Sequence, residues 1–415
     1  MKGNTTRRLY YFALTLYLLS KYIEVSTIYY TIEWINPILR IVRLSSYALA
    51  LIFTIINLSS SEKVCIRQLV LLGVTAIISY IAKSVTFFFN FLFIFGARDI
   101  KNKQLTKRVL MLQVLVTSAI VIGSFCGIVP NWEYLIGDRY RQSLGFFYPN
   151  RISSMYFFMV LAYCYLRGKK ISIVELAVLT IINFFIFHFT NTRMAFALTL
   201  VVLFVYLIIK IYKKPLKNNR LSRFVYLHSL YLIPLFAIVL CWMYTPSNSL
   251  LSKINDFVSN RLLMGHNALY KYPITLFGQK IEWVGFGGLG YIYNELPGEY
   301  NAVDCSYINI LLSNGIIIML IAIVGYILTA YCELKQGDRH FCVAILFMSI
   351  YCLIEPPYIE SGFNPFVWTL SVLLTKGITI KRNKGGVYFG IRDIRPGRDN
   401  KEKNLNIMGV DYFEH

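Results

Sequence analysis

MAFALTLVVLFVYLII, residues 194 to 209, contains no charged side chain and is closed by Arg193 on one side and Lys210 on the other. With its flanking residues, a helix of this kind crosses a hydrocarbon layer of roughly 30 Å, which takes about 20 apolar residues. Similar runs recur along the chain, and we expect about twelve membrane-spanning helices. The predicted fold is therefore an all-α, polytopic integral membrane protein. The runs are centred near residues 20, 49, 75, 91, 118, 160, 180, 203, 233, 317, 348 and 371.

The composition excludes two broad classes of protein. Of the 415 residues, 56% are hydrophobic and the mean hydropathy is +0.55, which leaves too little polar surface for a soluble protein. The formal charge of +21 does not indicate nucleic-acid binding, because most basic residues stand in short gaps between apolar runs, where they orient helices. The eight cysteines lack metal-ligand spacing and are expected to be small core residues.

The distribution of lysine and arginine predicts the orientation. Cytoplasmic segments are enriched in these residues, and with the N-terminus inside, the basic clusters fall on alternate gaps. The clusters lie near residues 7–8, 63–67, 98–108, 167–170, 210–223 and 335–339. Both termini are then cytoplasmic, and two sizeable segments, residues 129–151 and 243–303, face outward. The runs near 75 and 91 are short and joined around Lys83, so one broken or re-entrant pair is the alternative there.

The chain divides into a membrane domain, residues 1–380, and a basic cytoplasmic tail, residues 381–415. The tail is polar and includes the mixed-charge stretch RDIRPGRDNKEKN, so we expect it to be disordered or loosely associated with the membrane and assign it no chemistry. The first apolar run holds Lys21 and Glu24 and lacks a small-residue cleavage site, and we interpret it as a retained helix.

Outward-facing arginines are the first candidate site residues. The stretch GDRYRQSLGFFYPNR, residues 137–151, carries Arg139, Arg141 and Arg151. Arginines outside oppose the usual charge bias, which suggests that they have a use; contact with lipid phosphates is the plainer alternative. Arg193, in a tight outward turn, either anchors the interface or faces the same cavity.

The larger outward segment predicts a helix at the membrane surface. Leu250, Ile254, Phe257 and Arg261 are spaced by four, three and four residues, which is typical of an amphipathic helix. On the apolar side of such a helix, the planar guanidinium of Arg261 can pair with the phosphate of a lipid-linked anion. The alternative is that it only reaches the lipid headgroups.

Carboxylates follow in the same outward region. GFGGLG, residues 285–290, formally fits a dinucleotide fingerprint, but no strand, crossover helix or acidic partner accompanies it, so we interpret it as a flexible loop or as a turn that lets the backbone approach a sugar or phosphate. Glu295 precedes the tenth apolar run and Asp304 opens it. Asp304 either caps that helix or acts as a general base toward a hydroxyl. Glu355 and Glu360 lie at the outer end of the eleventh helix.

Taken in order, these stretches resemble the Wzy-type bacterial polysaccharide polymerases, relatives of the O-antigen ligases. The resemblance covers about residues 10 to 380. It rests on RQSLGFFYPNR (141–151), NTRMAF (191–196), NRLLMGHNALYKYPITLFGQKI (260–281), GFGGLGYIYN (285–294) with DCSYINILLSNGII (304–317), and NPF (364–366). One departure is Tyr148, since this family commonly has histidine before the Pro-Asn pair.

The resemblance implies a nucleotide-independent glycosyltransferase at the outer face of the bacterial cytoplasmic membrane. A glycan would pass from one undecaprenyl pyrophosphate carrier onto the terminal sugar of another repeat unit, in capsule, exopolysaccharide or O-antigen synthesis. A flippase and a chain-length regulator are the implied partners, and no cofactor or metal is required. The pyrophosphate-binding candidates are Arg141, Arg193 and Arg261, followed by Arg139 and Arg151. The candidates for the base are Asp304, then Glu295 and His266.

Two other functions compete with polymerisation. An O-antigen-ligase-like transferase uses the same donor and the same arginines with a different acceptor. A flippase or transporter for the lipid-linked oligosaccharide is expected to place charges along a central route through many spans. Charges inside the apolar runs are few, and polar residues concentrate in the two outward segments, which favours catalysis.

Overall fold

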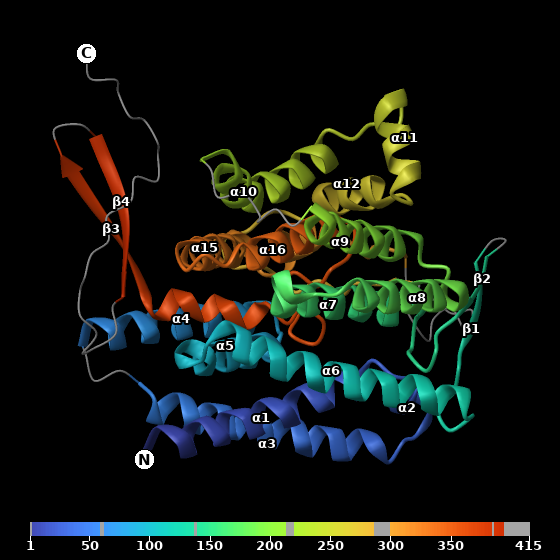
Figure 1. Ribbon diagram of the computed structural model, residues 1–415, viewed down its shortest axis with the longest axis horizontal. Helices are drawn as coiled ribbons and strands as arrows, with labels where there is room; N and C mark the ends of the chain where they lie inside the picture. The colour runs from blue at the N-terminus through green and yellow to red at the C-terminus, as the bar shows by residue number, and fades with distance from the viewer. Residues whose placement is uncertain are drawn as a thin grey trace.

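The computed structural model describes residues 2–58, 62–136, 139–212, 220–285, 299–383 and 386–393. Long helices lie alongside one another in a bundle, with one β-hairpin at each end (Figure 1). Among the described residues, seven helices are long and apolar enough to cross a membrane. The expected helical, multi-pass membrane protein is confirmed at this level. The seven are α3 (Ile35–Ile56), α4 (Glu62–Ile81), α6 (Asn102–Phe125), α8 (Ile173–Thr190), α9 (Arg193–Tyr212), α10 (Arg220–Trp242) and α15 (Gly315–Lys335).

Helix α9 contains the apolar run that predicted the fold. Its inward face is marked by Ala195, Thr199, Val202 and Tyr206, which are buried and recur at helical spacing. Phe204, by contrast, is 60% exposed. Exposed large apolar side chains recur on α3, α4, α6, α8 and α10, as required of helices whose outer faces meet lipid rather than water.

Two further long helices are α7 (Pro149–Arg167), which is enclosed by protein, and α1 (Lys2–Glu24), which buries one face and exposes Phe12 on the other. Tyr10, Tyr17 and Tyr22 of α1 are all buried, and almost every side chain of α7 is buried as well. Helices α3 and α6 pack against α1, while α6, α8, α9 and α16 (Arg339–Tyr351) surround α7. Because protein covers α7 and the inner face of α1, these surfaces carry tyrosines and serines that a lipid-facing surface would not.

Other apolar runs form shorter elements than the sequence predicts. The runs near residues 75 and 91 form α4 and α5 (Val85–Gly96), separated by Lys83, whose φ is +50°. At about 1.5 Å per residue, α5 spans only about 18 Å and is too short to cross a bilayer, whereas α4 is one of the seven full-length candidates. The expected twelfth span, near residue 371, is the eight-residue 3₁₀ helix η3 (Val367–Leu374), which is too short to cross a bilayer.

An irregular interior segment between α16 and η3 explains why the twelfth span fails. Residues 352–366 form successive turns, yet Tyr358 and Asn364 are fully buried. The Asn364 amide donates to the Tyr358 carbonyl at 2.7 Å, and its Oδ1 accepts from the Phe366 backbone N–H at 2.9 Å. Irregular backbone at this depth is tolerated only where protein satisfies its polar groups. The side chain of Asn364, within the NPF stretch, makes these hydrogen bonds to the backbone.

Two β-hairpins depart from the all-α expectation. Strands β1 (Glu133–Ile136) and β2 (Arg139–Gln142) pair antiparallel within the first outward segment. Strands β3 (Lys376–Asn383) and β4 (Gly386–Asp393) form a second hairpin after η3. The first residues of the tail, for which the sequence predicts disorder, lie in these paired strands. The rest of the tail lies outside the described residues.

Candidate functional site

The two segments expected to face outward meet at one end of the bundle. Arg261 begins α12 (Arg261–Lys271), and Glu355 follows the end of α16. Arg261 Nη2 lies 3.3 Å from Glu355 Oε1 and 3.3 Å from Asp304 Oδ2. Asn150, at the start of α7, donates its amide to Glu355 Oε1 at 3.2 Å and accepts from Arg141 Nη2 at 2.6 Å. These five residues are called the Arg261 cluster below.

A break in the surface helix positions Arg261. Helix α11 (Ser249–Phe257) and α12 are separated by Ser259 and Asn260, which both have positive φ. The buried Asn255 side chain bridges this break, since its amide donates to Asn260 Oδ1 at 2.8 Å and its Oδ1 accepts from the Leu263 N–H at 3.0 Å. The predicted single amphipathic helix is therefore wrong beyond Phe257. Arg261 opens a second helix and points into protein instead of lying on an apolar stripe.

Two backbone carbonyls fix the plane of the Arg261 guanidinium. Its Nε donates to the Ile354 carbonyl at 2.6 Å, and its Nη1 donates to the Val258 carbonyl at 3.0 Å. Its side chain is only 12% exposed. Burial disfavours the charged form, but the carboxylates of Glu355 and Asp304 outweigh this effect and raise the pKa of Arg261. A fixed cation therefore faces two acidic groups.

Glu355 is the buried carboxylate of the cluster. It lies in the turns that follow the end of α16 at Tyr351 and precedes Pro356, and the Ser306 hydroxyl donates to the Glu355 carbonyl at 2.6 Å. Burial, reinforced by the negative charge of Asp304, raises the pKa of Glu355 to about 7, although Arg261 and Arg151 oppose the shift. A carboxyl group of this kind exchanges its proton near neutral pH.

Asp304 is the accessible carboxylate of the cluster. Its side chain is 36% exposed, against 13% for Glu355. It stands two residues before α14 (Ser306–Ser313), whose N-cap is Cys305 and has no side-chain capping bond. The capping role considered from the sequence is therefore not observed, and the carboxylate pairs with Arg261 instead.

Arg141 is held deeper, beside the turn between α8 and α9. It is 8% exposed, and its Nε donates to the Thr190 carbonyl at 2.8 Å. Burial lowers the pKa of Arg141, because few charges offset the loss of hydration. Tyr148, the departure noted in the sequence, places its ring 5.5 Å from Arg141 Cζ. Arg141 thus orders the first outward segment from inside the protein.

The remaining candidates lie at different distances from the cluster. Arg151, in the first turn of α7, stacks 4.8 Å from the Phe147 ring and is close enough to act on Glu355 electrostatically. Arg139 is partly exposed in β2, and Arg193 is exposed at the first position of α9. Neither has a contact with the cluster's carboxylates among the described residues.

His266 and Glu295 do not join the cluster in the structure. His266 Nδ1 lies 3.1 Å from the Cys241 carbonyl of α10. It is five residues from Arg261 on α12, a rotation of about 140°, so the two side chains leave on different faces. Glu295 lies outside the described residues.

The sequence reasoning left out Glu355 and Asn150. Glu355 was placed at the outer end of its helix but given no role, although two prolines directly after it marked an abrupt stop. Asn150 stood within the resemblance as part of a Pro-Asn pair. The contacts of Glu355 with Arg261 and with Asn150 join segments 94 and 205 residues apart, which spacing along the chain does not reveal.

Comparison with protein-family models, with curated proteins and with solved structures gives no match. Within the described part of the chain, no group of three or more histidine, cysteine, aspartate or glutamate side chains is placed to hold a metal ion. The chemistry of the site is therefore argued from the Arg261 cluster alone.

Proposed function

We propose that the protein is a polysaccharide polymerase that joins undecaprenyl-pyrophosphate-linked oligosaccharide repeat units at the outer face of the bacterial cytoplasmic membrane. The single observation that supports it best is the Arg261 guanidinium, held between buried Glu355 and accessible Asp304. The same end of the bundle gathers both segments that the charge pattern predicts to face outward.

The diphosphate of the donor takes the place of Asp304 on Arg261. Asp304 is the more exposed of the two carboxylates, so the diphosphate displaces it from Arg261. Glu355 and the two backbone carbonyls keep the guanidinium in position. Arg151 and the N-terminus of α7 add positive potential on the same side. Donors fixed in a partly desolvated site stabilise the charge that develops on a departing diphosphate more strongly than water does.

Asp304, released from Arg261, then serves as the base. The acceptor hydroxyl oxygen attacks the anomeric carbon of the donor, the bond from that carbon to the diphosphate oxygen breaks, and the hydroxyl proton passes to Asp304. The leaving diphosphate takes the bonding electron pair, so no nucleotide or oxidant enters the step. Binding of the donor diphosphate to Arg261 thereby frees Asp304 to act as the base.

Arg141, Asn150 and Glu355 are positioning residues in this mechanism. Arg141 directs its donors at Thr190 and Asn150, and Asn150 in turn holds Glu355. The proposal therefore moves Arg141 from substrate contact, which the sequence favoured, to support of the site. Diphosphate contact is assigned to Arg261 and Arg151.

A reconstituted reaction tests the function. Purified full-length protein receives isolated lipid-linked repeat units without nucleotide, and the products are resolved by length. Long glycan is expected from the native protein; transfer to a different added acceptor without lengthening would identify a ligase. Movement of the intact donor across vesicles, without any new glycosidic bond, would reject the polymerase in favour of a flippase.

Substitutions in the same assay test the assigned roles. Asp304→Asn is expected to lower the rate by about a hundredfold or more, as for loss of a general base. Arg261→Ala is expected to cost on the order of a hundredfold, as for loss of one fixed donor. Asp256→Asn and Lys253→Ala, exposed on α11, are matched controls. Full activity of Asp304→Asn would remove it as the base.

A further inference from the structure

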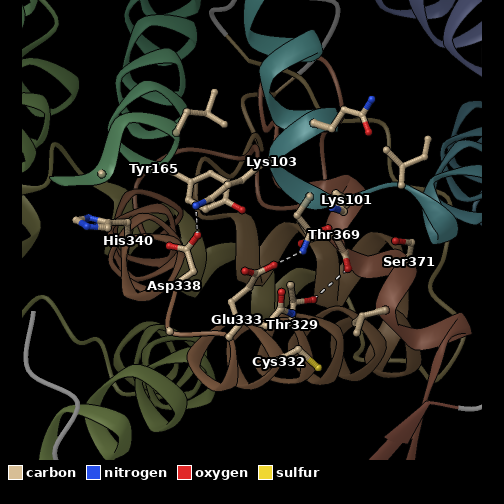
Figure 2. Close-up of a pocket in the computed structure, with 18 of the residues that line it drawn as sticks. Lys101, Lys103, Tyr165, Thr329, Cys332, Glu333, Asp338, His340, Thr369 and Ser371 are labelled. Carbon is tan, nitrogen blue, oxygen red and sulfur yellow. Dashed lines mark hydrogen bonds and ion pairs between the residues drawn. The ribbon is translucent and has the colours of Figure 1, made fainter. Parts of the chain in front are cut away.

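A polar cavity lies at the end of the bundle away from the Arg261 cluster. Helix α7 runs from Asn150 of the Arg261 cluster to Arg167 at the cavity. At about 1.5 Å per residue its length separates the two sites by roughly 25 Å. The cavity has a volume of 1210 Å³ and lies between the start of α6, the end of α7, the turn from α15 to α16, and η3. Figure 2 shows Lys101, Lys103 and Tyr165 around it.

The lining of this cavity is strongly basic. It includes nine lysine and arginine side chains and three carboxylates. Part of the positive charge is neutralised within the protein. Lys103 Nζ pairs with Asp338 Oδ2 at 2.5 Å, and Arg167 pairs with Glu175 at 2.8 Å. Glu333, at the floor, accepts from the Asn102 amide at 2.7 Å.

Three lysines remain available at the rim. Lys101 precedes α6, and Lys169 and Lys170 belong to the short 3₁₀ helix η2 (Gly168–Lys170). All three are exposed, and no ion pair involving them occurs among the described residues. They reach the cavity from two separate loops. The cavity is thus surrounded by positive charge that carboxylates of the protein neutralise only in part.

A buried hydroxyl provides an independent sign of a ligand. Tyr165 is 1% exposed and lines the cavity, and its hydroxyl has no hydrogen-bond partner in the part of the chain that the structure describes. A buried tyrosine hydroxyl normally has a partner, because leaving it without one costs free energy. Lys103 Nζ lies 5.5 Å from the same ring, so an acceptor placed there would also meet a cation.

We propose that this cavity binds an anionic, phosphate-bearing ligand. Lysines at the rim attract and pair with phosphate oxygens, and the Tyr165 hydroxyl donates at the wall. The volume exceeds the needs of a single phosphate and suits a ligand of cofactor size. Two sources share this chemistry: the headgroup of an anionic phospholipid, as basic pockets between membrane helices bind, and a soluble diphosphate.

Binding to the full-length protein in neutral phosphatidylcholine nanodiscs tests the proposal. Inorganic pyrophosphate is titrated at constant ionic strength while the melting temperature is followed, since a ligand of the folded state raises it with concentration. In a parallel arm, nanodiscs contain phosphatidylglycerol, and lipid that stays on the protein is counted by native mass spectrometry. A response to pyrophosphate identifies the soluble source, and retained phosphatidylglycerol without that response identifies the lipid.

The variants decide whether the cavity is responsible. Lys169→Ala with Lys170→Ala is expected to weaken binding by roughly tenfold or more, and Tyr165→Phe by a smaller factor, roughly threefold to tenfold. Lys107→Ala with Lys210→Ala removes the same charge outside the cavity and is expected to bind as the native protein does. Absence of binding by both probes, or equal loss in both double variants, overturns the proposal.

Discussion

Removing Arg261 tests the electrostatics of the cluster most directly. In Arg261→Ala, Glu355 stays buried without its cation, and breaking such a pair typically costs about 3 to 5 kcal/mol. The pKa of Glu355 is already raised to about 7, so protonation near neutral pH limits the cost. We therefore expect about 3 kcal/mol of lost stability at pH 8 and less at pH 6.

The double variant Arg261→Ala with Glu355→Gln separates the charge from the packing. Glutamine keeps the shape and the contact with Asn150 but has no charge to leave uncompensated, so the double variant is expected to be about 1 to 2 kcal/mol more stable than the sum of the two single effects predicts. The Ile354 and Val258 carbonyls still lose their donor, and this part of the loss is expected to persist.

Reversible denaturation in mixed detergent micelles measures these free energies of unfolding. The reasoning is refuted if the double variant is as unstable as the two single losses combined, because the uncompensated carboxylate would then not be the cause. Glycan assays on the same proteins add a second result. The double variant is expected to regain stability and to remain inactive, since the proposed mechanism needs the guanidinium to receive the diphosphate.

Three further predictions follow from contacts elsewhere in the structure. Because the pKa of Glu355 is higher in the folded than in the unfolded chain, the stability that this group contributes is greatest at low pH and is lost as the pH rises through about 7. Between pH 6 and pH 8 the free energy of unfolding is expected to fall by roughly 1 kcal/mol from this cause. The fall is expected to disappear in Glu355→Gln. Asn364→Ala leaves the buried Phe366 N–H unpaired, while the Tyr358 carbonyl keeps the Tyr326 hydroxyl as a donor at 2.9 Å, so the variant is expected to cost about 2 kcal/mol, measured as a lowered melting temperature, with Asn102→Ala at a partly exposed position showing a smaller drop. Asn255→Ala removes the bridge between α11 and α12 and is expected to cost about 1 to 2 kcal/mol and to increase proteolysis at Ser259, while an uncut loop would contradict that role.

The sequence was sufficient to predict a helical membrane protein, because a helix surface that faces lipid must be apolar and long apolar runs are visible in the sequence. The run in α9 predicts its helix to within a few residues, since every outward position must be apolar. The sequence was insufficient for apolar segments that are surrounded by protein instead of lipid. The apolar residues of η3 resemble a span in composition, but a buried turn around Asn364 interrupts the chain before them. Apolarity alone does not distinguish a lipid-facing helix from a short, enclosed segment.

For the candidate site, local pattern identified individual residues but not their pairing. Arg261 and Asp304 were chosen by residue type and position, and they lie 3.3 Å apart. His266 was chosen in the same way, although its rotation about α12 directs it elsewhere. Glu355 is 94 residues from Arg261 along the chain, and only the packing of α16 against α7 and α10 brings it to the cluster.

The partial-length segments α5 and η3 have a consequence for biogenesis. Neither is long enough to enter a bilayer as an independent stable unit, and the two pack against each other in the finished protein. Each must be accommodated after neighbouring helices have formed a protein-lined space, which places them late in assembly at the translocon. Inherited changes in these segments would therefore lower the amount of protein in the membrane and leave the chemistry of the surviving molecules intact.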